Sequence, residues 1–345
     1  MKGIRANGEP IWGFGVQVSG FGVDGLSIPT KWNWNLPWVI PVLVFTLFVT
    51  ACGGPRPATR PAVQRDAYYH RMITSGHGAF QRGDISRAAE LYENALVRAQ
   101  IMDRPEAIGS SAYNLALCRI ALGDLKEGRD LLRKARVELR RAGESGLDTL
   151  LAEAEVTRRL GEAEAAWTLT DEAVVALEGI RARHERIQVH SLRALLALDR
   201  DDVENATDEL ALAERQVRRD TPFRLQARLA EVRGRLHWAG DDPVLAAQEF
   251  DQEAMHYRNE GRFQDMARAM TRAAAAYDKA DDQGLAADRF YRSARHYAAA
   301  GDPVEALKLV ERALPSLEQA EDPALEQRVA ALFEKLTETV KDKRE

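Results

Sequence analysis

The sequence predicts an all-α protein made of repeated helix pairs, and two periodic observations carry that prediction. A turn of Gly or Asp followed by an acidic residue recurs at intervals of 40, 38, 40 and 40 residues, at Gly83-Asp84, Gly123-Asp124, Gly161-Glu162, Asp201-Asp202 and Asp241-Asp242. A small residue lies seven positions before each turn, at Gly76, Ala116, Ala154, Ala194 and Gly234. Because small residues let facing helices approach closely, this period predicts stacked helix pairs with one continuous core.

The segments between these turns favour helix. They are rich in Ala, Leu, Glu and Arg, and none alternates apolar and polar residues as a strand would. Helices of roughly 17 residues, with a turn near every twentieth position, predict about fourteen helices in about seven antiparallel pairs over residues 67–345. The last helix, from about Pro323 to Val340, is polar and is expected to cap the solenoid. Gly261 and Gly301 also fit as turns but lie half a repeat out of phase, which leaves the phase after about residue 240 open.

Residues 1–51 indicate a leader that precedes the fold. Their apolar run ends on Val49-Thr50-Ala51-Cys52. This order of aliphatic, small, small and Cys resembles the lipobox of bacterial lipoprotein signal peptides. The resemblance implies cleavage before Cys52, diacylation of its thiol, and durable attachment to a bilayer through the acyl chains. Because Gly53 and not aspartate follows the cysteine, the resemblance also implies the outer membrane, with the protein facing the periplasm.

Two other interpretations of this leader stay open. The stretch from Leu36 to Ala51 is 16 residues long, which is short against the ~20 apolar residues of a membrane span. A single span or an ordinary cleaved signal is nevertheless an alternative to the lipobox. The leader is long, has few basic residues, and is glycine-rich over residues 13–25, so we expect translation to begin further on, near Val23 or Leu26.

Residues 52–66 indicate a tether between the modified cysteine and the folded domain. Pro55, Pro57 and Pro61 punctuate this segment, which lacks the apolar residues of a core. Proline-rich chains adopt extended conformations that rise ~3 Å per residue. We therefore expect this segment to hold the repeat domain away from the lipid surface.

The repeat itself resembles the tetratricopeptide repeat (TPR). The match is best over residues 83–96, GDISRAAELYENAL, and recurs in Asn114-Leu115-Ala116 with Ala121-Leu122-Gly123-Asp124 and in residues 300–306 with Ala313-Leu314. The period is closer to 40 than to the family's usual ~34 residues. The resemblance implies a right-handed superhelix whose concave face, lined by the first helix of each pair, binds peptide segments.

Carried over by repeat position, the resemblance assigns a candidate peptide-binding surface of mixed polar and aromatic character. Its members are His70, Ile73, Phe80, Tyr113, Asn114, Leu117, Glu155, Arg158, Gln188, Ser191, Arg228, Glu231, Arg235 and Trp238. Asn114 matches a position where relatives hold the backbone of the ligand. The Lys and Asn partners of the carboxylate-clamp variety are missing nearby, which argues against capture of a C-terminal carboxylate.

The sequence contains no motif of a known catalytic or metal site. Phosphate loops, nucleophile elbows, zinc-protease motifs and cysteine pairs are absent, and the seven histidines are scattered. The net charge of −5 argues against a nucleic-acid partner. Cys118 lies in an apolar register and is expected to be a buried, unreactive thiol. We therefore expect no enzyme activity, no cofactor, no metal and no small-molecule substrate.

Together these patterns predict an outer-membrane-anchored periplasmic scaffold that binds protein or peptide segments for an envelope assembly complex. The functional part of this prediction rests on architecture, which many activities share. Three alternatives remain. One is an enzyme with an undetected site, which would need polar residues with strongly perturbed pKa values clustered inside the groove. The protein could be a regulatory helper that binds and activates a peptidoglycan enzyme or senses a peptide, or a repeat protein anchored by a single membrane span.

Overall fold

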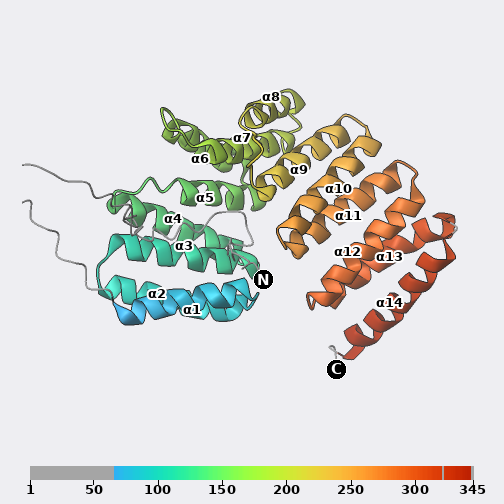
Figure 1. The fold of residues 1–345 in the computed structure, drawn as a ribbon, viewed down its shortest axis with the longest axis horizontal. Helices are drawn as coiled ribbons and strands as arrows, with labels where there is room; N and C mark the ends of the chain where they lie inside the picture. The colour runs from blue at the N-terminus through green and yellow to red at the C-terminus, as the bar shows by residue number, and fades with distance from the viewer. Residues whose placement is uncertain (1–65, 321, 343–345) are drawn as a thin grey trace, which may run out of the picture.

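The structure, a computed structural model, describes residues 66–320 and 322–342. This part of the chain forms fourteen helices and no strand, and the helices pack in chain order into an arc (Figure 1). They are α1 (Ala67–Gln81), α2 (Ile85–Ile101), α3 (Pro105–Ala121), α4 (Leu125–Arg141), α5 (Leu147–Arg159), α6 (Ala163–Ala176), α7 (Arg183–Leu198), α8 (Val203–Glu214), α9 (Phe223–Ala239), α10 (Pro243–Asn259), α11 (Phe263–Lys279), α12 (Gln283–Ala299), α13 (Pro303–Ala320) and α14 (Pro323–Asp342). The predicted all-α solenoid of seven helix pairs is confirmed. The predictions for residues 1–65, including Cys52 and most of the tether, lie outside the described residues.

The recurring turn signature is a left-handed residue followed by a helix cap. The first residue has a positive φ in every within-pair turn from α1/α2 to α11/α12, at Gly83, Gly123, Gly161, Asp201, Asp241 and Asp281. Glycine adopts this conformation without strain, and Asp is among the few other residues that tolerate it. The next residue caps the following helix. The side chains of Asp84 and Asp242, for example, accept the backbone N–H three residues on.

The structure also settles the repeat phase that the sequence left open. Gly261 and Gly301 have φ values of 72° and 83° and connect one pair to the next, α10 to α11 and α12 to α13. Asp241 and Asp281 make the turns within pairs. Both kinds of turn need a residue with positive φ, so the residue type alone does not distinguish them. The pairs therefore continue in one phase as α9/α10, α11/α12 and α13/α14.

The core is built by small residues that receive a large side chain from the other helix of the same pair. A Cβ added at Gly76 of α1 would lie 2.9 Å from the ring of Tyr92 on α2. One added at Gly234 of α9 would lie 2.6 Å from the ring of Phe250 on α10. The three alanines at equivalent positions, Ala116, Ala154 and Ala194, are fully buried. The periodic small residues thus mark where paired helices touch.

The helices form two limbs that meet at α6–α8 (Figure 1). Helices α1–α5 make one limb and α9–α14 the other, and α7 packs against both α5 and α9. First helices of successive pairs therefore adjoin at the junction, where they bring side chains from distant segments together. Within the described residues, no helix combines the length and the apolar character that crossing a membrane requires.

Candidate functional site

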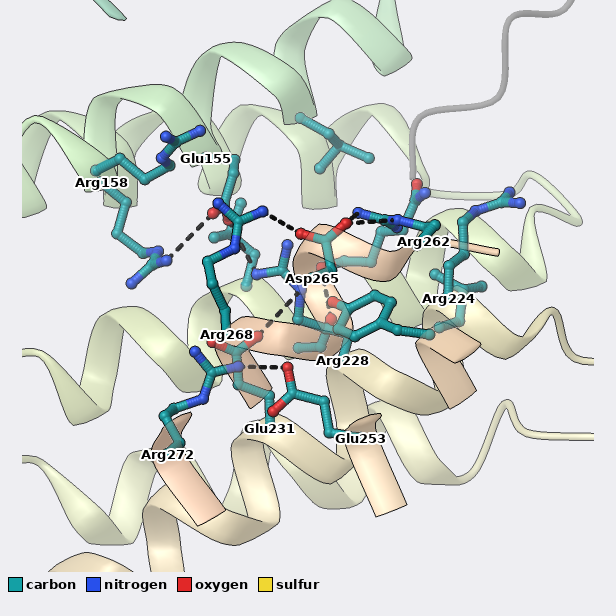
Figure 2. A pocket seen from close by; sticks show the side chains of 17 residues that line it. Glu155, Arg158, Arg224, Arg228, Glu231, Glu253, Arg262, Asp265, Arg268 and Arg272 are labelled. Atoms are coloured by element: carbon teal, nitrogen blue, oxygen red, sulfur yellow. Dashed lines mark hydrogen bonds and ion pairs between the residues drawn. The ribbon is translucent and has the colours of Figure 1, made fainter. Parts of the chain in front are cut away.

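A cavity of about 300 Å³ opens at the junction of the two limbs (Figure 2). Helices α5, α7, α9, α10 and α11, or the residue that caps them, supply its walls. The lining residues are Leu151, Glu155, Arg158, Arg159, Gln188, Ser191, Leu192, Arg224, Leu225, Arg228, Glu231, Glu253, Tyr257, Arg262, Asp265, Arg268 and Arg272. Four successive helix pairs thus contribute to one site, and its volume is at the lower end of the range for ligand pockets.

Arginine dominates the lining of this cavity. Seven arginines face four carboxylates there, so positive side chains outnumber negative ones by three. The whole chain, in contrast, carries a net charge of −5. Positive charge in a concavity with low-dielectric walls focuses the field on whatever enters it. The cavity is therefore a cationic site on an acidic protein.

Glu155 of α5 is held between two of these arginines. Nη2 of Arg158 donates to its Oε1 over 3.1 Å, and Nη1 of Arg228 donates to its Oε2 over 3.0 Å. Burial by itself would raise the pKa of Glu155, but the charges of the two guanidinium groups outweigh it and lower the pKa to about 2. Because Arg228 lies on α9, this ion pair joins the two limbs across 73 residues of sequence.

Asp265 of α11 is the second paired carboxylate. It is largely buried, accepts a hydrogen bond of 2.8 Å from Nε of Arg262, and accepts another from Arg268. The guanidinium of Arg262 also lies 4.7 Å from the ring centroid of Tyr257, where the face of the ring attracts a cation. These contacts fix the α11 side of the cavity.

Glu253 of α10 differs from Glu155 and Asp265 because it is fully buried and only one of its two carboxylate oxygens accepts a hydrogen bond. Its Oε1 accepts a hydrogen bond from Arg272, whereas its Oε2 has no hydrogen-bond partner among the described residues. Burial is the main influence on its pKa. The charge of Glu231 adds to this and that of Arg272 opposes it, so the pKa rises from 4.5 to about 7. Near neutral pH this carboxyl is therefore partly protonated.

Several guanidinium groups are crowded against one another. Burial lowers the pKa of Arg159, and the positive charges of Arg268 and Arg158 lower it further, although Glu155 opposes this. The Nε atoms of Arg158 and Arg272 are buried and have no hydrogen-bond partner within the described part of the chain. The site therefore holds hydrogen-bond donors and positive charge beyond what its own carboxylates use.

Five of the nine principal residues of the predicted concave surface lie in this cavity, namely Glu155, Arg158, Gln188, Arg228 and Glu231, together with Ser191 of the wider set. The other four lie outside its lining. Tyr113 and Asn114 are buried in α3. Arg235 binds Asp199 over 2.6 Å, and the exposed ring of Trp238 lies 4.7 Å from Nζ of Lys279.

The sequence prediction omitted the part of the cavity that α10 and α11 supply. Arg262, Asp265, Arg268 and Arg272 line it at spacings of three, three and four residues. That spacing places side chains on one face of a helix. With the correct repeat phase, α11 is the first helix of its pair, and the resemblance would have assigned this face to the concave side of the solenoid. The uncertainty in phase after about residue 240 therefore explains the omission.

Comparison with known proteins identifies the fold. No family model matches the chain, and no curated protein matches it in sequence. Among solved structures, the APC/C hetero-tetramer Cut9–Hcn1 matches with a TM-score of 0.53 and 15% identity, over 73% of this chain and 44% of that one. The apo form of RapI matches with a TM-score of 0.50 and 10% identity, over 72% and 97%. The fold is TPR-like.

A tetratricopeptide repeat protein from Parabacteroides merdae is also similar, with 15% identity and a TM-score of 0.43 over 78% of this chain and 98% of that one. This TPR-like chain spans less than half the length of the Cut9–Hcn1 chain that it matches. At such identities, likeness shows the fold and not the activity.

Proposed function

We propose that this protein is a binding scaffold that captures a segment of a partner protein in the cavity between α5 and α11. The observation that carries the proposal is the convergence of polar side chains from four helix pairs on one concave site, with Leu151, Leu192 and Leu225 as its apolar part. Helical solenoids bind through such concave surfaces. A cavity of about 300 Å³ suits a few side chains of an extended segment.

The proposal is tested by filling the cavity without changing its charge. Gln188 lines the site from α7 and is partly exposed, so a tryptophan there has room to project into the cavity. The matched control is Gln100→Trp on the exposed side of α2. Wild type, Gln188→Trp and the control are each used to isolate bound proteins from detergent-solubilised membranes. A partner that wild type and control retain and Gln188→Trp loses supports the proposal. A partner that all three retain equally overturns it.

We further propose that the scaffold is a lipoprotein anchored to the outer membrane, where it faces the periplasm and serves an envelope assembly complex. The lipobox resemblance at Val49-Thr50-Ala51-Cys52 and the proline-rich tether support this address. The alternative of a regulatory helper uses the same cavity and differs in the partner, which would be a peptidoglycan enzyme or a signal peptide. Mass spectrometry of the N-terminal peptide tests the anchor. An acylated Cys52 supports it, and an uncleaved, unmodified N-terminus contradicts it.

A further inference from the structure

We propose that the cavity binds its ligand through negative charge, and that it takes a cluster of carboxylates from an acidic stretch of the partner segment. This inference rests on the proposed function, because it names the chemistry of the captured segment. It depends on three features of the cavity: its excess of arginine, its unused buried donors, and the way its own carboxylates are placed.

The first feature is the excess of guanidinium groups. Seven arginines and four carboxylates line the cavity, and the four carboxylates leave a surplus of three positive charges even when all are ionised. A guanidinium presents planar, paired donors that match the two oxygens of a carboxylate. Asp199, outside the lining, also pairs with Arg158 over 2.9 Å, and an acidic segment would add counter-charge to the arginine-rich lining where a neutral segment would add none.

The second feature is the set of buried donors that the protein itself leaves unused. Nε of Arg158, on α5, and Nε of Arg272, on α11, lie on opposite limbs, are buried, and donate to no acceptor within the described residues. A buried polar group without a partner costs free energy, and a ligand that supplies the acceptor recovers it. A cluster of carboxylates offers acceptors that can reach both limbs at once.

The third feature is that two of the cavity's own carboxylates are each engaged by a particular pair of arginines. Glu155 engages Arg158 and Arg228, and Asp265 engages Arg262 and Arg268. Arg159 of α5 and Arg268 of α11 line the same cavity, and burial together with the repulsive charge of Arg268 lowers the pKa of Arg159, whereas Glu155 and Asp265 raise it. An anion bound between these limbs would offset the repulsion between Arg159 and Arg268 further.

The test measures the affinity of the full-length protein in detergent for two labelled synthetic peptides. One carries a run of glutamates, and the other carries glutamines at the same positions. We expect the glutamate peptide to bind, to bind more weakly as salt is raised, and to bind much more tightly than the glutamine peptide. Arg268→Gln should weaken its binding about tenfold, since it removes one charged contact. Asp265 keeps Arg262 in this variant, so the fold should survive.

The matched control is Arg87→Gln. Arg87 is an exposed arginine of α2 that pairs with Glu90 over 2.6 Å, and the affinity of this variant should equal that of wild type. Arg159→Gln provides a second cavity variant, and circular dichroism confirms that each protein is folded. Equal affinity of wild type and both cavity variants for the glutamate peptide would overturn the inference.

The remaining outcomes separate this inference from the proposed function. If both peptides bind equally and Gln188→Trp abolishes this binding, the cavity captures segments without requiring negative charge. That outcome overturns this inference and supports the proposed function. Free citrate, a compact tricarboxylate, is titrated in parallel. Binding of citrate that depends on Arg268, without binding of either peptide, overturns the inference that the anion is a stretch of a protein segment and supports a site for small anions. Failure of both peptides and citrate to bind overturns this inference, and the isolation of partners with Gln188→Trp then decides whether segment capture holds.

Discussion

Glu253→Gln should make the stability of the protein less dependent on pH. Glu253 is fully buried on α10 and faces Arg272 from α11, Glu231 and Arg228 from α9, and Tyr257 of its own helix. Burial opposes its charged form more than Arg272 favours it, which raises its pKa from 4.5 to about 7. Glutamine keeps the oxygen that Arg272 contacts and carries no charge at any pH.

The magnitude follows from the pKa. One pKa unit corresponds to about 1.4 kcal/mol, so a rise from 4.5 to about 7 corresponds to about 3 kcal/mol. Between these two values the folded state holds a proton that the unfolded state releases. The stabilising contribution of this proton is therefore complete below pH 4.5 and is lost as the pH rises through 7. Above pH 7 the folded wild type contains a buried negative charge that lowers its stability, and the variant lacks this charge.

The assay is urea denaturation of wild type and Glu253→Gln at pH 5 and pH 8. We expect similar free energies of unfolding at pH 5, and a variant more stable than wild type by about 1–3 kcal/mol at pH 8. Subtracting the two pH profiles cancels the titration of the other carboxylates, including Glu155, whose pKa is lowered to about 2. Glu90→Gln, at an exposed ion pair on α2, is the matched control. A variant less stable than wild type at pH 8 would show that Arg272 favours the ionised carboxylate, and would refute the reasoning.

Three further predictions concern the binding site, the core and the buried thiol. If an acidic segment binds beside Glu253, the affinity of the glutamate peptide should rise as the pH falls from 8 to 6, because protonation removes a repulsive charge, and Glu253→Gln should abolish this dependence. Gly234→Ala should lower the free energy of unfolding by about 1–3 kcal/mol, because the added Cβ would lie 2.6 Å from a buried ring. Gly284→Ala, whose added Cβ would lie 3.9 Å from Oδ1 of Asp282, should be neutral or stabilising, and equal urea curves for these two variants would contradict the close-approach account. Cys118, whose pKa burial raises to about 12, should react with Ellman's reagent at pH 8 only after unfolding in a chain that lacks Cys52, whereas labelling of the native protein would contradict its burial.

Much of the fold could be predicted because its determinants are local. A residue with positive φ and an acidic cap at Gly83-Asp84 specify a turn and a helix start wherever they recur, and the small residue seven positions earlier specifies where the helices touch. Phase was harder to predict, since Gly261 and Asp241 satisfy the same backbone requirement in two different kinds of turn. About half of the predicted surface lies in the cavity because repeat position places first-helix residues such as Glu155 and Arg228 on the concave side.

The sequence by itself determined the period, the helices and the positions of the turns, because each depends on residues within one or two helices. Only the tertiary structure decided which side chains meet. Arg159 and Arg268 are more than a hundred residues apart, and their crowding depends on the small rotations between successive pairs, which accumulate along the solenoid. Those rotations are set by packing over every interface between α5 and α11. No local sequence pattern determines the total rotation between α5 and α11, so the arginine-rich cavity could be recognised only in the tertiary structure.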